Sequence, residues 1–111
     1  MQDNKILKEL NACASTCNVC YNECLNEDNV TVMVRCVELT RECADICQAT
    51  ASLLSRDSEN IDKYLRLCAE ICEICAEECD KHPQEYCQKC SQVCRSCSEI
   101  CFELQPAYLI D

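Results

Sequence analysis

Residues 67–79 read Leu-Cys-Ala-Glu-Ile-Cys-Glu-Ile-Cys-Ala-Glu-Glu-Cys, and this stretch decides the fold. Its cysteines, Cys68, Cys72, Cys75 and Cys79, follow one another at spacings of four, three and four residues. On an α-helix with about 3.6 residues per turn, such spacings place side chains along one stripe, as in the seam between bundled helices. The stretch has no alternation typical of a strand. It therefore predicts a helix whose inner face is made of thiols.

The same spacing recurs in three other segments of the chain. These segments contain Cys13, Cys17, Cys20 and Cys24; then Cys36, Cys43 and Cys47; and finally Cys87, Cys90, Cys94, Cys97 and Cys101. The second of them has one gap in its stripe, where Leu39 or Thr40 stands. Breaks between the stripes predict four helices, at about residues 4–25, 30–54, 59–80 and 84–104.

Short polar segments separate these helices and favour an antiparallel arrangement. We expect Asp57 or Ser58 to be the N-cap of the third helix, and Pro83 to occupy the first position of the fourth. Three short connections between four helices are typical of up-down-up-down packing. The sequence therefore predicts an all-α protein, a single domain over residues 1–111 that forms a four-helix bundle with a cysteine-lined core.

The two ends of this bundle should differ. In up-down packing, apolar residues that flank the cysteine stripes meet at one end and should form an ordinary apolar plug, made of Ile6, Leu10, Leu53, Leu54, Ile61, Tyr64, Leu65, Leu104 and Tyr108. The opposite end carries Asp28, His82 and Met33. The thiols should therefore line a tube with a single mouth near His82.

Composition limits the classes of function. The chain has 111 residues, of which 16 are cysteine and none is glycine, and its net charge is −10. This charge argues against binding to nucleic acid or to an anionic membrane surface. No segment has the length of a membrane span, and the N-terminus lacks the apolar stretch of a signal peptide. We therefore expect a cytoplasmic protein with reduced thiols.

Three interpretations of the cysteines compete. Disulfides within a straight helix are strained, because Cβ atoms four residues apart are about 5–6 Å from each other, whereas a disulfide needs about 3.5–4.5 Å. Cysteine as an inert core residue is a poor explanation. Leu or Ile at these positions would stabilise the bundle better, because burial of each such side chain contributes roughly 1.5–3 kcal/mol to stability. Metal ligation remains, because a linear sulfur–metal–sulfur unit spans about 4.5 Å and matches pairs four residues apart.

The type of metal follows from the ligands. Thiolates select soft ions, and a continuous row of equivalent thiols suits Cu(I), which accepts two or three sulfurs and tolerates bridging. A zinc- or cadmium-sequestering protein is an alternative. A thiol redox enzyme is a weaker one, because such an enzyme needs one activated and exposed Cys-x-x-Cys pair. We predict that many Cu(I) ions bind per chain and that the protein is not an enzyme.

Residues 67–79, together with His82 and the stretch Tyr-Cys-Gln-Lys-Cys-Ser-Gln-Val-Cys-Arg-Ser-Cys at residues 86–97, resemble the bacterial copper storage proteins. The resemblance covers nearly the whole chain. It implies a four-helix bundle that stores Cu(I) on its core cysteines, assembly into a homotetramer, and the cytosolic branch of the family. It also implies that His82 is a copper ligand at the mouth, although a capping residue before Pro83 is an equally simple interpretation. Met33 is more simply explained as a core or interface residue.

Overall fold

Four long helices account for most of the computed structural model, which describes the backbone of residues 2–104 and the side chains of residues 5–104. They are α1 (Gln2–Leu25), α2 (Val34–Ser55), α3 (Ile61–Asp80) and α4 (Glu85–Glu103), and a short 3₁₀-helix, η1 (Val30–Met33), precedes α2. The described part of the chain contains no strand. The predicted all-α class is confirmed.

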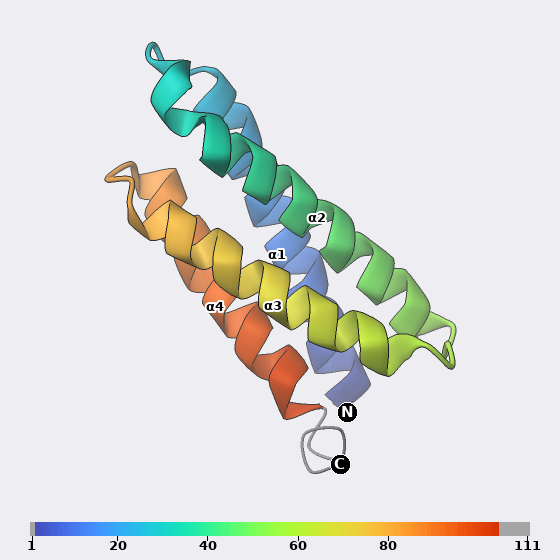
Figure 1. Cartoon of the computed structure of the whole chain (residues 1–111). Helices are drawn as coiled ribbons and strands as arrows, with labels where there is room; N and C mark the ends of the chain where they lie inside the picture. Colours follow the sequence, from blue (N-terminus) through green and yellow to red (C-terminus); the bar gives the residue numbers. More distant parts are fainter. Residues whose placement is uncertain (1, 105–111) are drawn as a thin grey trace.

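The helices form an up-down-up-down bundle of about 45 × 25 × 20 Å (Figure 1). Helix α1 packs against α2 and α4, and α3 packs against the same two neighbours. The turn between α1 and α2 and the turn between α3 and α4 lie at one end, and the α2–α3 turn lies at the other (Figure 1). The predicted topology is confirmed.

The start of the second helix differs from the prediction. Residues 30–33 form a 3₁₀ turn in place of an α-helix, and Met33 is the N-cap residue of α2. Met33 is buried, with 1% of its surface exposed. A turn of tighter pitch at this point brings an apolar side chain from the connection into the end of the core.

The turn between α2 and α3 corrects the predicted cap. The N-cap of α3 is Asn60, neither Asp57 nor Ser58. Asp57 instead has a φ of 57°, and its backbone N–H donates to the carbonyl of Leu54 while that of Ser58 donates to Leu53. This pair of hydrogen bonds is a Schellman motif that ends α2. Asp57 therefore occupies the left-handed position that glycine usually takes, in a chain that has no glycine.

We expect Asp57→Gly to stabilise the protein slightly. Glycine removes the steric cost of the left-handed conformation, and its greater freedom in the unfolded chain offsets part of the gain, so the net change is about 0.5 kcal/mol. The unfolding temperature should rise by about 2–4 °C in a thermal melt of the apoprotein. Asp57→Ala is the matched control and should lower it. Equal melting temperatures for both variants would contradict this account of the turn.

The start of the fourth helix also lies later than predicted. Helix α4 begins at Glu85, its N-cap is Gln84, and Pro83 precedes that cap without being a helical residue. Gln84 has an extended ψ of 140°, and its carbonyl accepts hydrogen bonds from the N–H groups of Cys87 and Gln88. The first helical carbonyl thus belongs to Gln84, which leaves Pro83 in the connection.

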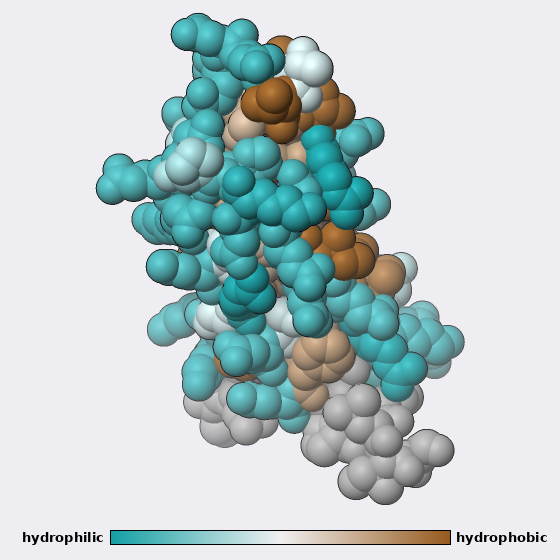
Figure 2. All heavy atoms as spheres, turned by 60° about the vertical axis from the view of Figure 1, so that its left-hand side comes forward, coloured by the Kyte–Doolittle hydropathy of each residue, from teal (hydrophilic) through white to brown (hydrophobic). Residues whose placement is uncertain are grey.

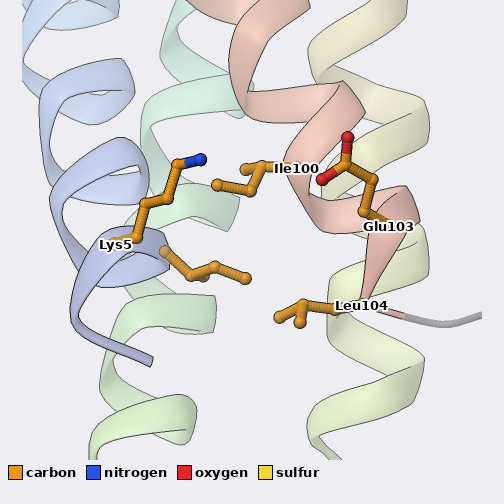
Figure 3. Close-up of a pocket in the computed structure, with 5 residues that line it drawn as sticks. Lys5, Ile100, Glu103 and Leu104 are labelled. Atoms are coloured by element: carbon orange, nitrogen blue, oxygen red, sulfur yellow. The ribbon is translucent and has the colours of Figure 1, made fainter. Parts of the chain in front are cut away.

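The apolar plug is present at the end that holds the α2–α3 turn. Ile6, Leu10 and Leu65 are buried, and Ile100 is 9% exposed. In Figure 3, Ile100 and Leu104 lie across from Lys5 of α1. Other predicted members are partly buried, namely Leu53, Leu54, Ile61, Tyr64 and Leu104, while Tyr108 lies outside the described residues. A small pocket in the plug, lined by Lys5, Ile6, Ile100, Glu103 and Leu104, contains no thiol.

The outer surface carries most of the charge. The face shown in Figure 2 is mainly hydrophilic, and its hydrophobic atoms lie in small separate patches. Among residues 2–104, no helix has both the length and the apolar character that a membrane span requires.

Candidate metal centre

The sixteen cysteines form the interior of the bundle. All are free thiols, and each has 0% of its surface exposed. They come from all four helices and lie on the stripes that the spacing of four, three and four residues predicts.

The thiols contact one another along the length of the core. The Sγ atoms of Cys17 and Cys94 are 3.5 Å apart, and those of Cys24 and Cys36 are 3.6 Å apart. Several groups have all their sulfurs within 4.8 Å of one another. In order from the plug to the mouth, these include Cys13, Cys47, Cys72 and Cys97; Cys13, Cys17, Cys43 and Cys94; Cys17, Cys75, Cys90 and Cys94; Cys20, Cys79 and Cys90; and Cys20, Cys24, Cys36 and Cys87.

These groups combine helices, whereas the sequence predicted bridges to neighbouring helices only for Cys36 and Cys87. The prediction paired thiols four residues apart on one helix, and such pairs do occur, for example Cys20 with Cys24 at 3.9 Å. The group of Cys13, Cys47, Cys72 and Cys97, however, takes one thiol from each helix. Each thiol therefore has neighbours both along its own helix and across the core, so that ligands can be shared between adjacent sites.

Cys68 and Cys101 are the two cysteines nearest the plug, and they interact with the other core thiols. The sulfur of Cys68 lies 3.8 Å from that of Cys47 and 3.9 Å from that of Cys72. Hydrogen bonding to Cys68 and burial raise the pKa of the Cys101 thiol. The row of thiols therefore extends as far as the aliphatic plug.

The spacing of the sulfurs fits soft metal ions. Three sulfurs that surround one ion at about 2.3 Å lie about 4.0 Å apart, and two that ligate it linearly lie about 4.5 Å apart. The observed contacts, such as 3.6 Å between Cys43 and Cys72 and 3.8 Å between Cys17 and Cys90, need only small rotamer adjustments to reach these values. Each group can thus hold an ion without movement of the helices.

Burial in the core favours the protonated form of the thiols when no ion is bound. Burial first, and then the adjacent Cys36, raise the pKa of the Cys24 thiol to about 12. Among residues 5–104, no lysine, arginine or histidine is buried, so no fixed positive charge stabilises a thiolate in the core. A bound cation is what can supply that charge, and each binding event releases protons.

The gap in the second stripe is occupied by Thr40. Its side chain is buried, and its hydroxyl donates to the carbonyl of Cys36 at 2.7 Å, whereas Leu39 is only partly buried. Thr50, which the sequence analysis did not single out, continues the stripe towards the plug and donates to the carbonyl of Ile46 in the same way. Helix α2 therefore contributes fewer ligands than the other helices.

A buried carboxylate, Glu78, organises the mouth on the α2–α3 side. Its side chain is 7% exposed and lies 3.1 Å from Nε of Arg35, 3.4 Å from Nζ of Lys81 and 3.0 Å from Nε2 of His82. The backbone N–H of His82 also donates to the carbonyl of Cys79, as expected of a capping residue. The His82 ring is thus fixed by Glu78 at the end of α3, with 13% of its side chain exposed.

A second polar contact closes the α1–α4 side of the mouth. The hydroxyl of Tyr86 donates a short hydrogen bond to the carboxylate of Glu27 in the α1–α2 turn. Burial, and then this bond, raise the pKa of Tyr86. The sequence analysis assigned no role to Tyr86, Glu27 or Glu78, although the spacing of four residues between Glu78 and His82 is a recognisable signal for a contact on one helix.

The chain is similar to solved structures of copper storage proteins. The chain matches a Cu(I)-bound copper storage protein with 35% identity and a TM-score of 0.89, over 93% of this chain and 97% of the other. It matches the apo form of a copper storage protein from Bacillus subtilis with 36% identity and a TM-score of 0.86, over 91% and 96%. A copper storage protein from Streptomyces lividans loaded with 10 copper equivalents matches with 35% identity and a TM-score of 0.90, over 93% and 83%.

Sequence comparisons point to the same group. An uncharacterised cysteine-rich protein, YhjQ, from Bacillus subtilis is 40% identical over 61 residues, which cover 55% of this chain and about half (56%) of that protein. The family model for copper storage proteins matches residues 1–106. A bundle with sixteen buried thiols, solved relatives of the same fold and this family match lead to one conclusion: the chain belongs to the copper storage protein family.

Proposed function

We propose that this protein stores Cu(I) in the cytoplasm and holds the ions on the thiolates of its sixteen core cysteines. The observation that carries the proposal is the continuous row of buried thiols, with sulfur contacts of 3.5–3.9 Å from the plug to the mouth. Soft thiolates in contact with one another suit an ion that accepts two or three sulfurs and tolerates bridges. Storage in this form keeps copper away from solvent and from redox reactions.

The number of ions follows from how the thiols are shared. Two unshared thiolates per ion correspond to about eight ions per chain, and bridging raises that number. Membership of overlapping groups, as for Cys13, Cys17 and Cys94, supports bridging. A titration of the reduced apoprotein with Cu(I) in the presence of a weak chromophoric chelator measures the capacity. Saturation at one or two ions per chain would disprove storage.

The mouth at His82 is the proposed entrance. The ring lies at the end of the thiol row opposite the plug, and Glu78 holds it through Nε2, which leaves Nδ1 as the nitrogen available to an incoming ion. Arg35 and Lys81 balance the charge of Glu78, so that the mouth is not a strong site for hard cations.

We expect His82→Ala to slow the transfer of Cu(I) from a chelator by about tenfold and to leave the capacity unchanged. Glu78→Gln should slow it in the same direction, since the amide fixes the ring less firmly. Stopped-flow absorbance of the chelator follows the transfer. Lys81→Ala is the matched control, because Lys81 contacts the same carboxylate with a 68% exposed side chain and should leave the rate unchanged. An unaltered rate in His82→Ala would place the entrance elsewhere.

Location, assembly and lack of catalysis are part of the same proposal. A relative from Streptomyces lividans that is 35% identical is described as cytosolic, which supports the proposed cytoplasmic location. We also propose that the protein forms a homotetramer and is not an enzyme. All sixteen thiols are buried, so the described chain offers no exposed cysteine for disulfide exchange. Cell fractionation and a disulfide-reductase assay test location and catalysis.

Zinc or cadmium sequestration is the alternative that the geometry also permits. Groups of four thiols, such as Cys20, Cys24, Cys36 and Cys87, can surround a tetrahedral ion. Their overlap favours Cu(I), because structural zinc sites are usually closed sets of four ligands. Competition between Zn(II) and Cu(I) for the reduced apoprotein, followed by metal analysis, separates the two functions. Retention of zinc in the presence of equimolar Cu(I) would favour the alternative.

A further inference from the structure

The sulfur contacts in the core form two sets. The outer set lies next to the mouth, and contacts of 3.6–3.9 Å link its five members, Cys20, Cys24, Cys36, Cys79 and Cys87. The other eleven of the sixteen cysteines form the inner set, which continues to the plug. Within the inner set, the sulfurs of Cys17 and Cys94 are 3.5 Å apart, and those of Cys47 and Cys68 are 3.8 Å apart. Each set draws on all four helices.

The two sets meet at a level of the bundle where α2 supplies no thiol. The group that joins them takes one thiol each from α1, α3 and α4, namely Cys20, Cys79 and Cys90, with all sulfurs within 4.8 Å of one another. The next group towards the plug also has no member from α2. The groups on either side of these two include Cys36 and Cys43 of α2. We call this level, at which the joining group has only three thiols, the junction.

Thr40 occupies the place from which α2 would supply a ligand to the junction. It follows Cys36 by four residues and precedes Cys43 by three, and its side chain is 0% exposed. The sulfur of Cys36 lies 3.9 Å from that of Cys79, and the sulfur of Cys43 lies 3.6 Å from that of Cys72. Since Thr40 lies between Cys36 and Cys43 on α2, it is at the height of the junction.

The hydroxyl of Thr40 is a poor ligand for a soft ion. Its oxygen is hard and uncharged, whereas Cu(I) prefers thiolate sulfur. Its proton is engaged as well, because the hydroxyl donates to the carbonyls of Cys36 and Val37 at 2.7 and 3.2 Å. An ion at the junction therefore has thiols on three sides of the core and none on the α2 side.

We propose that Thr40 divides the stored copper into an outer pool, which exchanges quickly through the mouth, and an inner pool, which exchanges slowly. A Cu(I) ion moves along the core by ligand exchange. It forms a bond to the next thiolate before it breaks one to the last, its charge does not change, and the vacated thiolate takes up a proton. A level with one ligand fewer offers fewer such exchanges, so passage across the junction is slow. The inference rests on the proposed storage of Cu(I) and on the proposed entrance.

Removal of copper from the fully loaded protein tests the two pools. An excess of a strong chromophoric Cu(I) chelator, under anaerobic conditions, should remove the copper in two phases, which absorbance follows. Five of the sixteen thiols belong to the outer set, so the fast phase should account for about a third of the copper. Thr40→Cys supplies the missing ligand and should merge the two phases into one.

Thr50 provides the matched control on the same helix. Its side chain is also 0% exposed, and its hydroxyl donates to a backbone carbonyl in the same way, but it lies on the plug side of Cys47. Thr50→Cys therefore adds a thiol away from the junction and should keep the two phases. Thr40→Val removes the hydroxyl without adding sulfur and should keep them as well. Circular dichroism establishes that each variant is folded.

A Cu(I) titration of the natural protein separates failure of this inference from failure of the storage function. Saturation at one or two ions per chain would overturn both. A high capacity with release in a single phase would overturn the two pools and leave storage intact. Two unchanged phases in Thr40→Cys, or their loss in Thr50→Cys or Thr40→Val, would likewise overturn the role of Thr40.

Discussion

Lowering the pH by one unit will weaken Cu(I) binding by between about tenfold and about 100-fold per ion. The ligand is the thiolate, and Cys24 and Cys101 keep their protons in the empty core, because burial raises the pKa of Cys24 to about 12 and hydrogen bonding to Cys68 raises that of Cys101. An ion that takes two unshared thiols displaces two protons, which corresponds to about 100-fold per pH unit. An ion held by shared thiols displaces about one, which corresponds to about tenfold.

Competition with a Cu(I) chelator between pH 6 and pH 8 measures this dependence, once the protonation of the chelator itself is taken into account. The slope of log affinity against pH then reports how far sulfurs are shared between ions. The overlapping groups around Cys13, Cys17 and Cys94 lead us to expect a slope below two. An affinity that does not change with pH would mean that the thiols of the apoprotein are already ionised, contrary to their environment.

Filling the core with Cu(I) will stabilise the fold strongly, and most of all at alkaline pH. Each ion adds about 2.7 kcal/mol to the free energy of unfolding when its free concentration is 100 times its dissociation constant. The sum over several ions is therefore larger than the usual free energy of unfolding of a small domain. The empty core behaves differently at high pH. A pKa that is raised in the folded state contributes stability below the ordinary thiol value of 9.0, and this contribution is lost as the pH rises through about 12 for Cys24.

Thermal unfolding of the empty and loaded proteins at pH 7 and pH 10, under anaerobic reducing conditions, measures both effects. The unfolding temperature of the empty protein should fall between the two pH values, because the unfolded chain loses thiol protons that the folded chain retains. The loaded protein should show little of this fall, since its sulfurs have already lost their protons to copper binding. A chelator that removes copper should restore the alkaline sensitivity. Equal behaviour of the two forms would contradict the proposed ligands.

The sequence was sufficient to predict the fold because its pattern is redundant. Four stripes with nearly the same spacing specify four helices and the face that each one buries, and short turns leave one simple topology. The plug followed from where Ile6, Leu10 and Leu65 lie relative to the cysteines. The ends of the helices were less predictable. Helix α2 ends where Asp57 adopts a left-handed backbone conformation, and α4 begins where the carbonyl of Gln84 accepts the first helical hydrogen bonds. No residue pattern in the sequence indicates either feature.

Contacts between helices could not be predicted from the spacing. A stripe tells which thiols face the core, but the rotation and axial shift of each helix decide that Cys13 meets Cys47, Cys72 and Cys97. The same applies to the bond between Tyr86 and Glu27, which joins residues 59 positions apart in the sequence. Glu78 is a different case, since a glutamate beside Glu77 reads as part of a solvated surface until the packing of α2 buries it.

Because the cysteines follow a repeating spacing, the number of ions that the bundle can hold depends on the length of its helices. The cysteine stripes contain no glycine and no loop that a particular site requires, and overlapping groups of thiols follow one another along the core. Seven more residues in every helix would lengthen the core by about 10.5 Å and continue the same pattern. Longer helices would leave the mouth and the plug unchanged. Bundles of this design can therefore differ in the number of ions they hold while ions enter through the same kind of mouth.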